Sequence, residues 1–162
     1  MKNNFFVADS TCFDEFDIRI LQEIKRDGRI SIQALSETIG LSTTPVARRL
    51  KRLEDAGIIN GYTALIDEAA LGFEVSVFVS VKLDRQIDHG LSAFETEIAQ
   101  FPEVVDCWLM TGNRDYMMRV VTRNLIEFEN FLVGRLTKIS CVAEIESSIP
   151  LRRVKSDIAR TL

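Results

Sequence analysis

The stretch LSTTPVARRLKRLEDAGII, Leu41–Ile59, gathers four basic side chains within residues 48–52. The whole chain is nevertheless acidic, with a formal net charge of −4 at pH 7. On a helical wheel of about 100° per residue, Val46, Leu50 and Leu53 fall together as an apolar stripe. The basic side chains lie opposite this stripe or at its border. The stretch therefore predicts a helix that buries one face and presents a cationic one.

Proline and glycine indicate where this helix begins and ends. Pro45 fits the first helical position, because its missing N–H group would be unbonded there anyway, and Thr44 is then the expected N-cap. Gly57 is expected to end the helix. The following residues 58–67, IINGYTALID, are typical of a turn and a short strand. We interpret that strand as the wing of a winged helix.

Two shorter helices are expected before this one. Residues 13–28 repeat apolar side chains at helical spacing after a capping Asp14, and residues 29–40 do so between Ser31 and Gly40. Two helices joined by a short turn, the second basic on its outer face, form the helix-turn-helix geometry. In that geometry the second helix enters the major groove of double-stranded DNA.

Each predicted DNA contact follows from the chemistry of its side chain. The guanidinium fork of Arg48 matches guanine O6 and N7, so Arg48 is expected to read a base edge. Lys51 and Arg52 are expected to hold phosphates, and Arg49 could reach one from the border of the stripe. The full predicted set is Gln33, Ser42, Thr43, Thr44, Arg48, Arg49, Lys51 and Arg52. The alternative is an ordinary solvated helix face, since RRLKRLE is a common surface-helix composition.

The rest of the chain differs in charge and in hydrophobic period. Residues 1–65 hold nine basic and nine acidic residues, whereas residues 66–162 hold 11 and 15 and are not suited to lie along phosphates. Residues 73–83, FEVSVFVSVKL, alternate almost strictly, as a strand does. The elements expected after it are a helix in 88–101, strands in 104–111 and 115–122 joined by a turn, a helix in 124–136 and a strand in 141–149. This β-α-β-β-α-β order is ferredoxin-like, so the chain is predicted to be α+β.

A single sheet with helices on one side leaves its other face bare. If the valines of the first strand face the helices, that bare face carries Phe78. On the second strand, Trp108 and Met110 compete with Cys107 and Leu109 for the inside, so both faces of that strand are apolar. Such a surface needs a partner, and the simplest one is a second copy of the same sheet. The resulting homodimer would place two helix-turn-helix units on one duplex.

Four segments of the chain, taken in order, resemble the Lrp/AsnC, or feast/famine, family of transcriptional regulators. They are FDEFDIRILQEIKRDGRIS, LSTTPVARRLKRLEDAGIINGYTALID, ALGFEV and TGNRDYMMRV, and the resemblance runs from about Phe13 to about Lys155. It implies an N-terminal winged helix-turn-helix, a linker strand and a C-terminal ligand-sensing domain. We expect a leader in residues 1–12, the DNA-binding domain in 13–61, the linker in 62–72 and the ferredoxin-like domain with a C-terminal tail in 73–162.

The same resemblance implies a partner and a function. Proteins of this kind dimerise through their C-terminal sheets, often assemble further into octamers, and bind an amino acid or a related small molecule between subunits. We therefore expect a sequence-specific transcriptional regulator whose assembly or operator affinity responds to such an effector. The alternative within DNA binding is a DNA-organising protein that ignores small molecules.

The resemblance maps the effector site on the loop after the second strand of the C-terminal domain. The expected residues are Gly112, Asn113, Arg114, Asp115 and Tyr116, with Ser147 and Ser148 as weaker candidates across the dimer. Glycine lets backbone amides approach a carboxylate, Asp115 can take an α-ammonium, and Arg114 can add a charge-assisted contact. The alternative for the loop is a plain hairpin turn, and for the serines exposed strand positions.

Catalytic and metal chemistry find little support in the residues. The chain has one histidine, His89, and no P-loop or G-x-G-x-x-G, so no enzyme, cofactor or metal site is expected. The remaining enzymatic alternative is a sirohaem-decarboxylase-like protein that uses a histidine. Cys12, Cys107 and Cys141 are scattered and are expected to be inert. No secretory signal or membrane-spanning run is expected, which favours a cytoplasmic protein.

Overall fold

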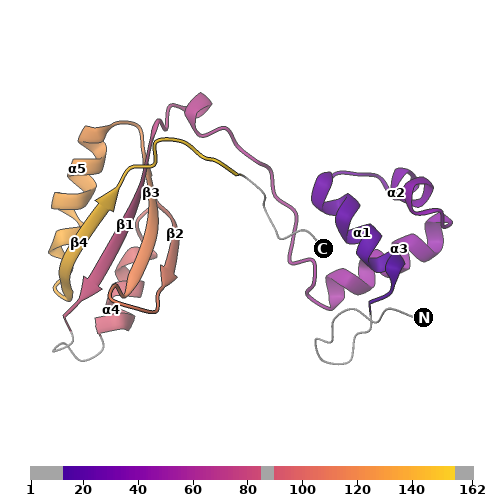
Figure 1. The fold of residues 1–162 in the computed structure, drawn as a ribbon, viewed down its shortest axis with the longest axis horizontal. Coiled ribbons are helices and arrows are strands. Elements are labelled where there is room, and N and C mark those ends of the chain that lie inside the picture. Colours follow the sequence, from indigo (N-terminus) through magenta and orange to yellow (C-terminus); the bar gives the residue numbers. More distant parts are fainter. Residues whose placement is uncertain (1–12, 85–89, 156–162) are drawn as a thin grey trace. The chain divides into compact units, whose positions relative to one another are not determined.

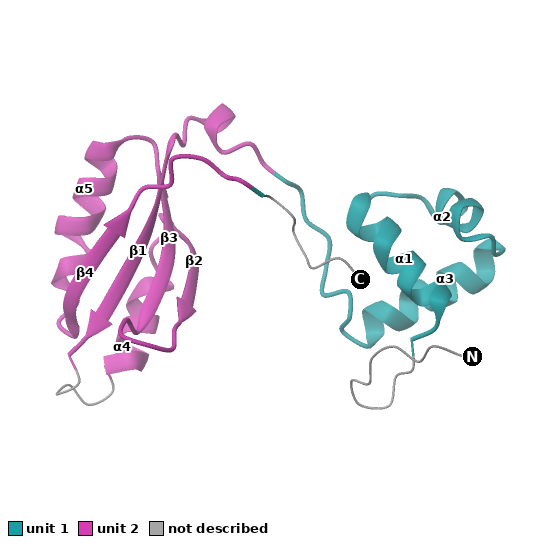
Figure 2. Cartoon of the chain, in the orientation of Figure 1, with its two compact units in different colours: residues 1–65, 155–162 teal, residues 66–154 magenta. Residues whose placement is uncertain are grey.

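The computed structural model describes residues 13–84 and 90–155, and the chain divides between Leu65 and Ile66 into two units (Figure 2). The division falls inside the segment 62–72 that the sequence predicts to be a linker. The expectations for the leader 1–12, for Cys12 and for His89 lie outside the described residues. No helix within the described ranges combines the length and the apolar character that crossing a bilayer requires.

Three helices build the first unit, residues 13–65 (Figure 1). They are α1 (Glu15–Arg26), α2 (Ile32–Ile39) and α3 (Thr43–Asp55). Their buried core consists of Ile20, Leu35, Ile39, Val46 and Leu53. Each side chain of this kind stabilises the fold by about 1.5–3 kcal/mol when it leaves water. The stripe predicted on α3 is confirmed, with Val46 and Leu53 buried and Leu50 partly buried against the same core.

The start of the helix follows the sequence signal at two of the three helices. The Asp14 carboxylate accepts from the Asp17 amide in a capping box, and Ser31 caps α2 by accepting from the Ala34 amide. At α3 the expectation was wrong, because the N-cap is Ser42 and not Thr44. The prediction fixed Pro45 at the first helical position, but every amide of the first turn lacks a helical partner, so proline is tolerated throughout that turn.

The segment after α3 forms no strand within one copy of the chain. Residues 58–68 form no ladder within the described chain, so the strands predicted for the wing and the linker have no pairing partner in one copy, and both stay predictions. Their apolar side chains Leu65 and Ile66 are 77% and 62% exposed. An extended stretch without a strand partner leaves its backbone groups to water, and alternating composition alone does not supply that partner. The segment ends instead in the 3-10 helix η1 (Ala69–Leu71).

The second unit is a four-stranded sheet with its helices on one face (Figure 1). Its elements are β1 (Val75–Leu83), α4 (Gly90–Ile98), β2 (Val104–Leu109), β3 (Tyr116–Thr122), α5 (Leu125–Gly134), the 3-10 helix η2 (Leu136–Lys138) and β4 (Val142–Ser148). The strand order is β2-β3-β1-β4, and all three pairs are antiparallel. The ferredoxin-like prediction is confirmed.

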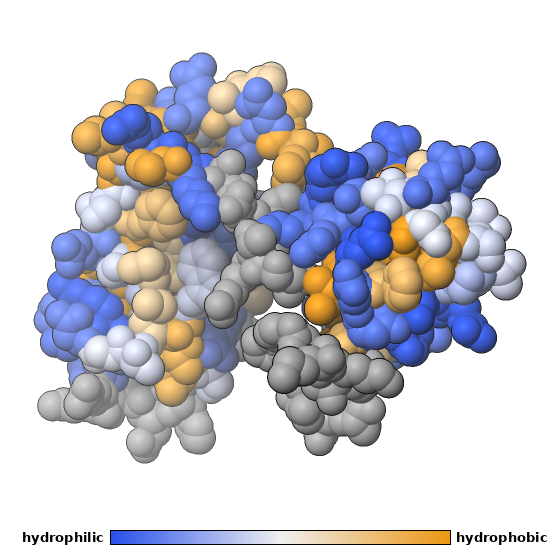
Figure 3. Space-filling model, turned by 45° about the vertical axis from the view of Figure 1, so that its right-hand side comes forward, coloured by the Kyte–Doolittle hydropathy of each residue, from blue (hydrophilic) through white to orange (hydrophobic). Residues whose placement is uncertain are grey.

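The register separates the two faces of the sheet. Val77, Val79 and Val81 are fully buried beneath α4 and α5, so the alternate residues of β1 lie on the opposite, open face. Residues paired across strands share a face, which places Arg119 beside Phe78 and Trp108 beside Met117 on the open face. Apolar side chains reach the surface of both units (Figure 3), and Trp108 is 46% exposed.

Candidate functional site

The four cations of α3 differ in what they contact. Arg48 is exposed and makes no hydrogen bond or ion pair with any other described residue. Lys51 lies 3.2 Å from Asp55 across one turn of the helix, with both side chains mostly exposed. Such surface pairs are worth only a few tenths of a kcal/mol, about 0.3–0.5, so Lys51 is readily available to a phosphate.

The other two cations reach back to α1. Arg49 donates to the carboxylates of Asp14 and Asp17 at 2.9 and 2.8 Å, and Arg52 forms an ion pair with Asp17. Arg49 and Arg52, both predicted to reach phosphates, are thus also held within the unit, because a carboxylate 0% exposed needs charged partners in place of water. The sequence signal was Asp17 itself, at a helical position facing the basic helix.

Electrostatics agree with this pairing. Partial burial opposes ionisation of Asp14, but hydrogen bonds from the Asp17 amide and from Arg49 hold its pKa below the usual value. Partial burial also opposes the charge of Arg49, whereas its bonds to Asp17 and Asp14 raise its pKa. The guanidinium of Arg49 further lies 5.5 Å from the centre of the Phe16 ring. These contacts favour the charged form of both partners.

The remaining predicted DNA contacts surround the start of α3. Ser42, Thr43 and Thr44 are exposed at its N-terminus, where unbonded backbone amides favour anions. Gln33 is exposed on α2, with its amide nitrogen 3.4 Å from a carboxylate oxygen of Glu37. Together with Arg48, these side chains leave a polar, solvent-facing end of α3 that can meet a base edge or a phosphate.

The predicted effector loop is a hairpin between β2 and β3. Gly112 has a φ of 118°, a conformation that favours glycine, and Gly112 and Asn113 are exposed. Arg114 bonds to Glu144 and Glu146 of β4, and these hydrogen bonds raise its pKa. The loop's cation is thus held against the open face of the sheet, beside two carboxylates.

Asp115 has a structural role that the sequence did not indicate. One oxygen of its carboxylate accepts the Leu83 amide at 2.7 Å, and its own amide donates to the Val81 carbonyl at 2.9 Å. These bonds continue the sheet beyond the paired residues. Its carboxylate can still take an ammonium, because each carboxylate oxygen has two lone pairs and the Leu83 amide uses only one of them.

Tyr116 belongs to the core and not to the loop surface. It is 1% exposed, its ring lies 4.6 Å from that of Phe94, and its hydroxyl donates to Glu95 at 2.7 Å. The expectation that Tyr116 contacts an effector is corrected, because β3 begins at this residue and the sheet's alternation turns it toward the helices.

The two serines of β4 lie on opposite faces. Ser147 pairs with Val79 on the side of the helices, whereas Ser148 pairs with Phe78 on the open face. The effector loop lies beyond Leu83, five residues farther along β1 than Phe78, or about 16 Å at the usual rise. Within one chain, the backbone of Ser148 is therefore remote from the loop, whereas the Arg114 side chain of the loop reaches Glu146, the neighbour of Ser147.

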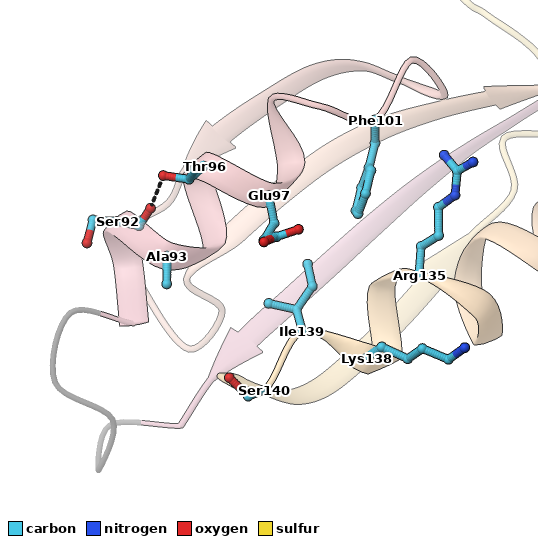
Figure 4. Close-up of a pocket in the computed structure, with 9 residues that line it drawn as sticks. All are labelled: Ser92, Ala93, Thr96, Glu97, Phe101, Arg135, Lys138, Ile139 and Ser140. Carbon is cyan, nitrogen blue, oxygen red and sulfur yellow. Dashed lines mark hydrogen bonds between the residues drawn. The ribbon is translucent and has the colours of Figure 1, made fainter.

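A pocket of about 610 Å³ opens between α4 and the segment around η2 (Figure 4). Residues from both segments line it: Ser92, Ala93, Thr96, Glu97, Phe101, Arg135, Lys138, Ile139 and Ser140. Arg135 lies 5.6 Å from the Phe101 ring and bonds to Glu103 at 3.0 Å. The other charged side chains are exposed, as in a solvent-filled groove. Sequence reasoning missed it, because two distant surface segments form it.

The two cysteines within the described residues, Cys107 and Cys141, show no sign of activation. Cys141 is 1% exposed and its thiol contacts the Gly90 carbonyl at 3.4 Å. Burial raises the pKa of the Cys141 thiol, and burial together with Glu95 raises that of Cys107. A raised pKa keeps the sulfur protonated and unreactive.

Both halves of the chain match known families. A winged helix-turn-helix DNA-binding model matches residues 13–60, and an Lrp/AsnC ligand-binding domain model matches residues 76–159. The Bkd operon transcriptional regulator of Pseudomonas aeruginosa is 44% identical over 87% of this chain and 92% of its own length. The chain belongs to the Lrp/AsnC family.

Further relatives of this Lrp/AsnC protein support the same fold and class. The leucine-responsive regulatory protein of Rhizobium meliloti is 37% identical over 88% of the chain and 91% of its own length. A Neisseria meningitidis transcriptional regulator in complex with L-Met superposes with a TM-score of 0.87 at 31% identity, over 93% of this chain and 96% of that one. The Lrp/AsnC protein is a DNA-binding transcriptional regulator with a ligand-binding domain, and the decarboxylase alternative is wrong.

Proposed function

We propose that this regulator reads a specific operator as a homodimer, and that an amino acid or a related molecule bound between subunits changes its operator affinity or assembly. The observation that carries the DNA part is Arg48. It is the cation of α3 that no described carboxylate holds, and it lies two turns or less from the exposed N-terminus of the helix. As a DNA-bound regulator, the protein is expected to act in the cytoplasm.

The division of contacts along α3 follows from these partners. Arg48 reads a base edge, since a free guanidinium can align both donors with guanine. Lys51 holds a phosphate, because its pair with Asp55 is exposed and weak. Thr43 and Thr44 add hydroxyl contacts to the backbone or to a base. Arg49 and Arg52 contribute less, because each would have to leave Asp17.

The open face of the sheet supports the homodimer. Trp108 and Met110 are 46% and 40% exposed there, and Phe78 and Met117 lie between them and the charged residues of β4. An apolar face of this kind is typical of a surface that a partner covers. A second copy of the chain is a partner that is present wherever the protein is made. Larger assemblies such as octamers can form by association of dimers.

The loop of residues 110–115 supports the effector site. Gly112 and Asn113 leave backbone amides open to a carboxylate, and one oxygen of Asp115 remains for an ammonium. The L-Met complex of the Neisseria meningitidis relative supports an amino acid as the class of ligand. Ser147 and Ser148 lie on opposite faces of β4, so we propose that they would complete the pocket from another subunit.

A thermal-shift screen of the full chain against the amino acids, followed by gel shifts with and without each hit, tests this function. A ligand at 100 times its Kd raises the unfolding free energy by about 2.7 kcal/mol. A hit that also changes operator affinity or sedimentation is the expected result. If the protein binds DNA but responds to no amino acid, the alternative of a DNA-organising protein would be favoured. If it binds no duplex, the proposal would be refuted.

A further inference from the structure

We propose that Asp17 is a positioning residue for DNA recognition: it holds Arg49 and Arg52 of the recognition helix, so that these two cations are withheld from the phosphates. The inference rests on the proposed function, in which α3 reads DNA. In this inference, the buried carboxylate of Asp17 on α1 controls how many cations α3 presents to DNA. Specificity would then depend on Arg48 against a limited background of phosphate contacts.

The carboxylate of Asp17 is fully occupied within the first unit. It is 0% exposed. One oxygen accepts from Arg49 at 2.8 Å, and the other accepts from Arg52 and from the Asp14 amide, the latter at 3.1 Å. These bonds join α1 to α3 across more than thirty residues of sequence.

Burial makes this arrangement selective. An ionised carboxylate out of water is costly unless charged partners surround it, and two guanidinium groups meet that need here. Asp14 takes the second end of Arg49 at 2.8 Å, so two carboxylates balance two guanidinium groups. Arg49 and Arg52 therefore add no net charge to the surface that α3 offers to DNA.

The spacing along α3 turns this balance into geometry. Arg48 and Lys51 are three residues apart, as are Arg49 and Arg52, so the helix carries two cation rows offset by about 100°. One row contacts α1, with Asp17 at its centre. The other row is exposed, and its members have either no carboxylate partner among the described residues or the exposed Asp55. Of the four cations on α3, the ion pairs with α1 thus leave two for DNA phosphates and bases.

The salt dependence of DNA binding measures that count directly. The slope of log Kobs against log salt is negative, and its magnitude decreases by about 0.9 for each phosphate contact that a variant loses. We would select an operator from a random duplex pool with the wild-type full chain, then measure slopes on it and on a random duplex. Lys51→Gln should reduce the magnitude of the slope by about 0.9, whereas Arg52→Gln should leave the slope unchanged.

Asp17→Asn provides the converse test. Loss of the carboxylate charge frees Arg52 and leaves Arg49 with Asp14 alone, so the magnitude of the slope should increase by about 0.9 to 1.8, and affinity should rise alike for the operator and for a random duplex. Asp55→Asn is the matched control, since it removes the same charge from an exposed position on α3. It should change the slope and the affinity for either duplex much less. Circular dichroism melts establish that each variant is folded.

The outcomes separate this inference from the proposed function. A slope for Arg52→Gln that falls as it does for Lys51→Gln would show that Arg52 holds a phosphate and would overturn the role of Asp17. This arm decides the question even if Asp17→Asn does not fold. A folded Asp17→Asn variant with wild-type slope and wild-type affinity for both duplexes would also overturn it. Failure of the wild-type protein to bind any duplex would instead refute the proposed function.

Discussion

Arg119 donates two hydrogen bonds to the carboxylate of Glu68, at 3.0 and 2.8 Å, and so ties the segment before β1 to the open face of the sheet. Asp106 of β2 lies 3.7 Å from the same guanidinium. The ion pair stands at the junction where the chain passes from the DNA-binding unit into the sheet. It is therefore a local anchor for the end of the linker.

Glu68→Gln should loosen this anchor with little effect on the core. The side chains of Arg119 and Glu68 are 27% and 39% exposed, so the loss should be about 1 kcal/mol or less. Amide hydrogen exchange should accelerate at Leu71 and Phe73, whose N–H groups donate to the Glu68 carbonyl. Glu74→Gln, an exposed neighbour, is the control. Equal exchange in both variants would show that the ion pair does not order this segment.

Acid should release the same anchor. Hydrogen bonds from Arg119 hold the pKa of Glu68 below its ordinary value of 4.5, against a smaller opposing effect of burial. A lowered folded pKa means that the ion pair stabilises the fold above the unfolded pKa, and that this contribution is lost as pH falls through the folded one. Exchange at Leu71 should therefore rise below about pH 4 in the wild type more than in Glu68→Gln, after correction for intrinsic rates.

Alternation and caps could be read from the sequence, whereas partners could not. Val77, Val79 and Val81 were placed on the helix side of the sheet by their period, and Asp14 and Ser31 by their capping chemistry. These features depend on neighbours a few residues away. The strand predicted for the wing forms no ladder in one chain, because a strand also needs a pairing partner, which no local pattern of residues 58–68 reveals.

The candidate site shows the same limit. Its exposed members, Arg48 and Gly112, lie where the sequence placed them, at the surface of α3 and in the hairpin. The contacts of Arg52 and Asp115 were not predicted, because each is a single long-range contact, to Asp17 and to the Leu83 amide. Contacts across more than thirty residues leave no periodic trace in a single sequence.

Both tyrosines of the chain should resist ionisation in the folded protein. Partial burial and the hydrogen bond to Glu54 raise the pKa of Tyr62 to about 12, and burial and Glu95 raise that of Tyr116 from its usual 10.0. The unfolded chain then releases these protons first, so stability should fall as pH rises above 10.0. Ultraviolet titration of tyrosinate measures the pKa of both tyrosines, and the Tyr62→Phe variant shows which transition belongs to Tyr62. A common midpoint at 10.0 would contradict the two hydrogen bonds.

Arg48→Ala and Lys51→Ala should weaken DNA binding in different ways. The arginine variant should lose about 1–3 kcal/mol of discrimination between operator and random duplex, because it loses a base-edge contact. The lysine variant should weaken both complexes alike, since a phosphate carries no sequence information. Equilibrium titrations on both duplexes at one salt concentration distinguish these results. Equal losses on every sequence for both variants would refute the assigned division of roles.

Asp115→Asn should separate the fold of the hairpin from its response to an amino acid. The amide oxygen of asparagine can still accept the Leu83 N–H, so the melting temperature should stay near that of the wild type. Loss of the charge removes the partner for an α-ammonium, so the ligand-induced thermal shift should disappear while DNA binding without ligand persists. Asp115→Ala should in addition lose about 1–3 kcal/mol of stability, because the buried amide is left unpaired. Glu129→Gln, an exposed carboxylate on α5, is the charge control. A full ligand response in Asp115→Asn would show that the ammonium is bound elsewhere.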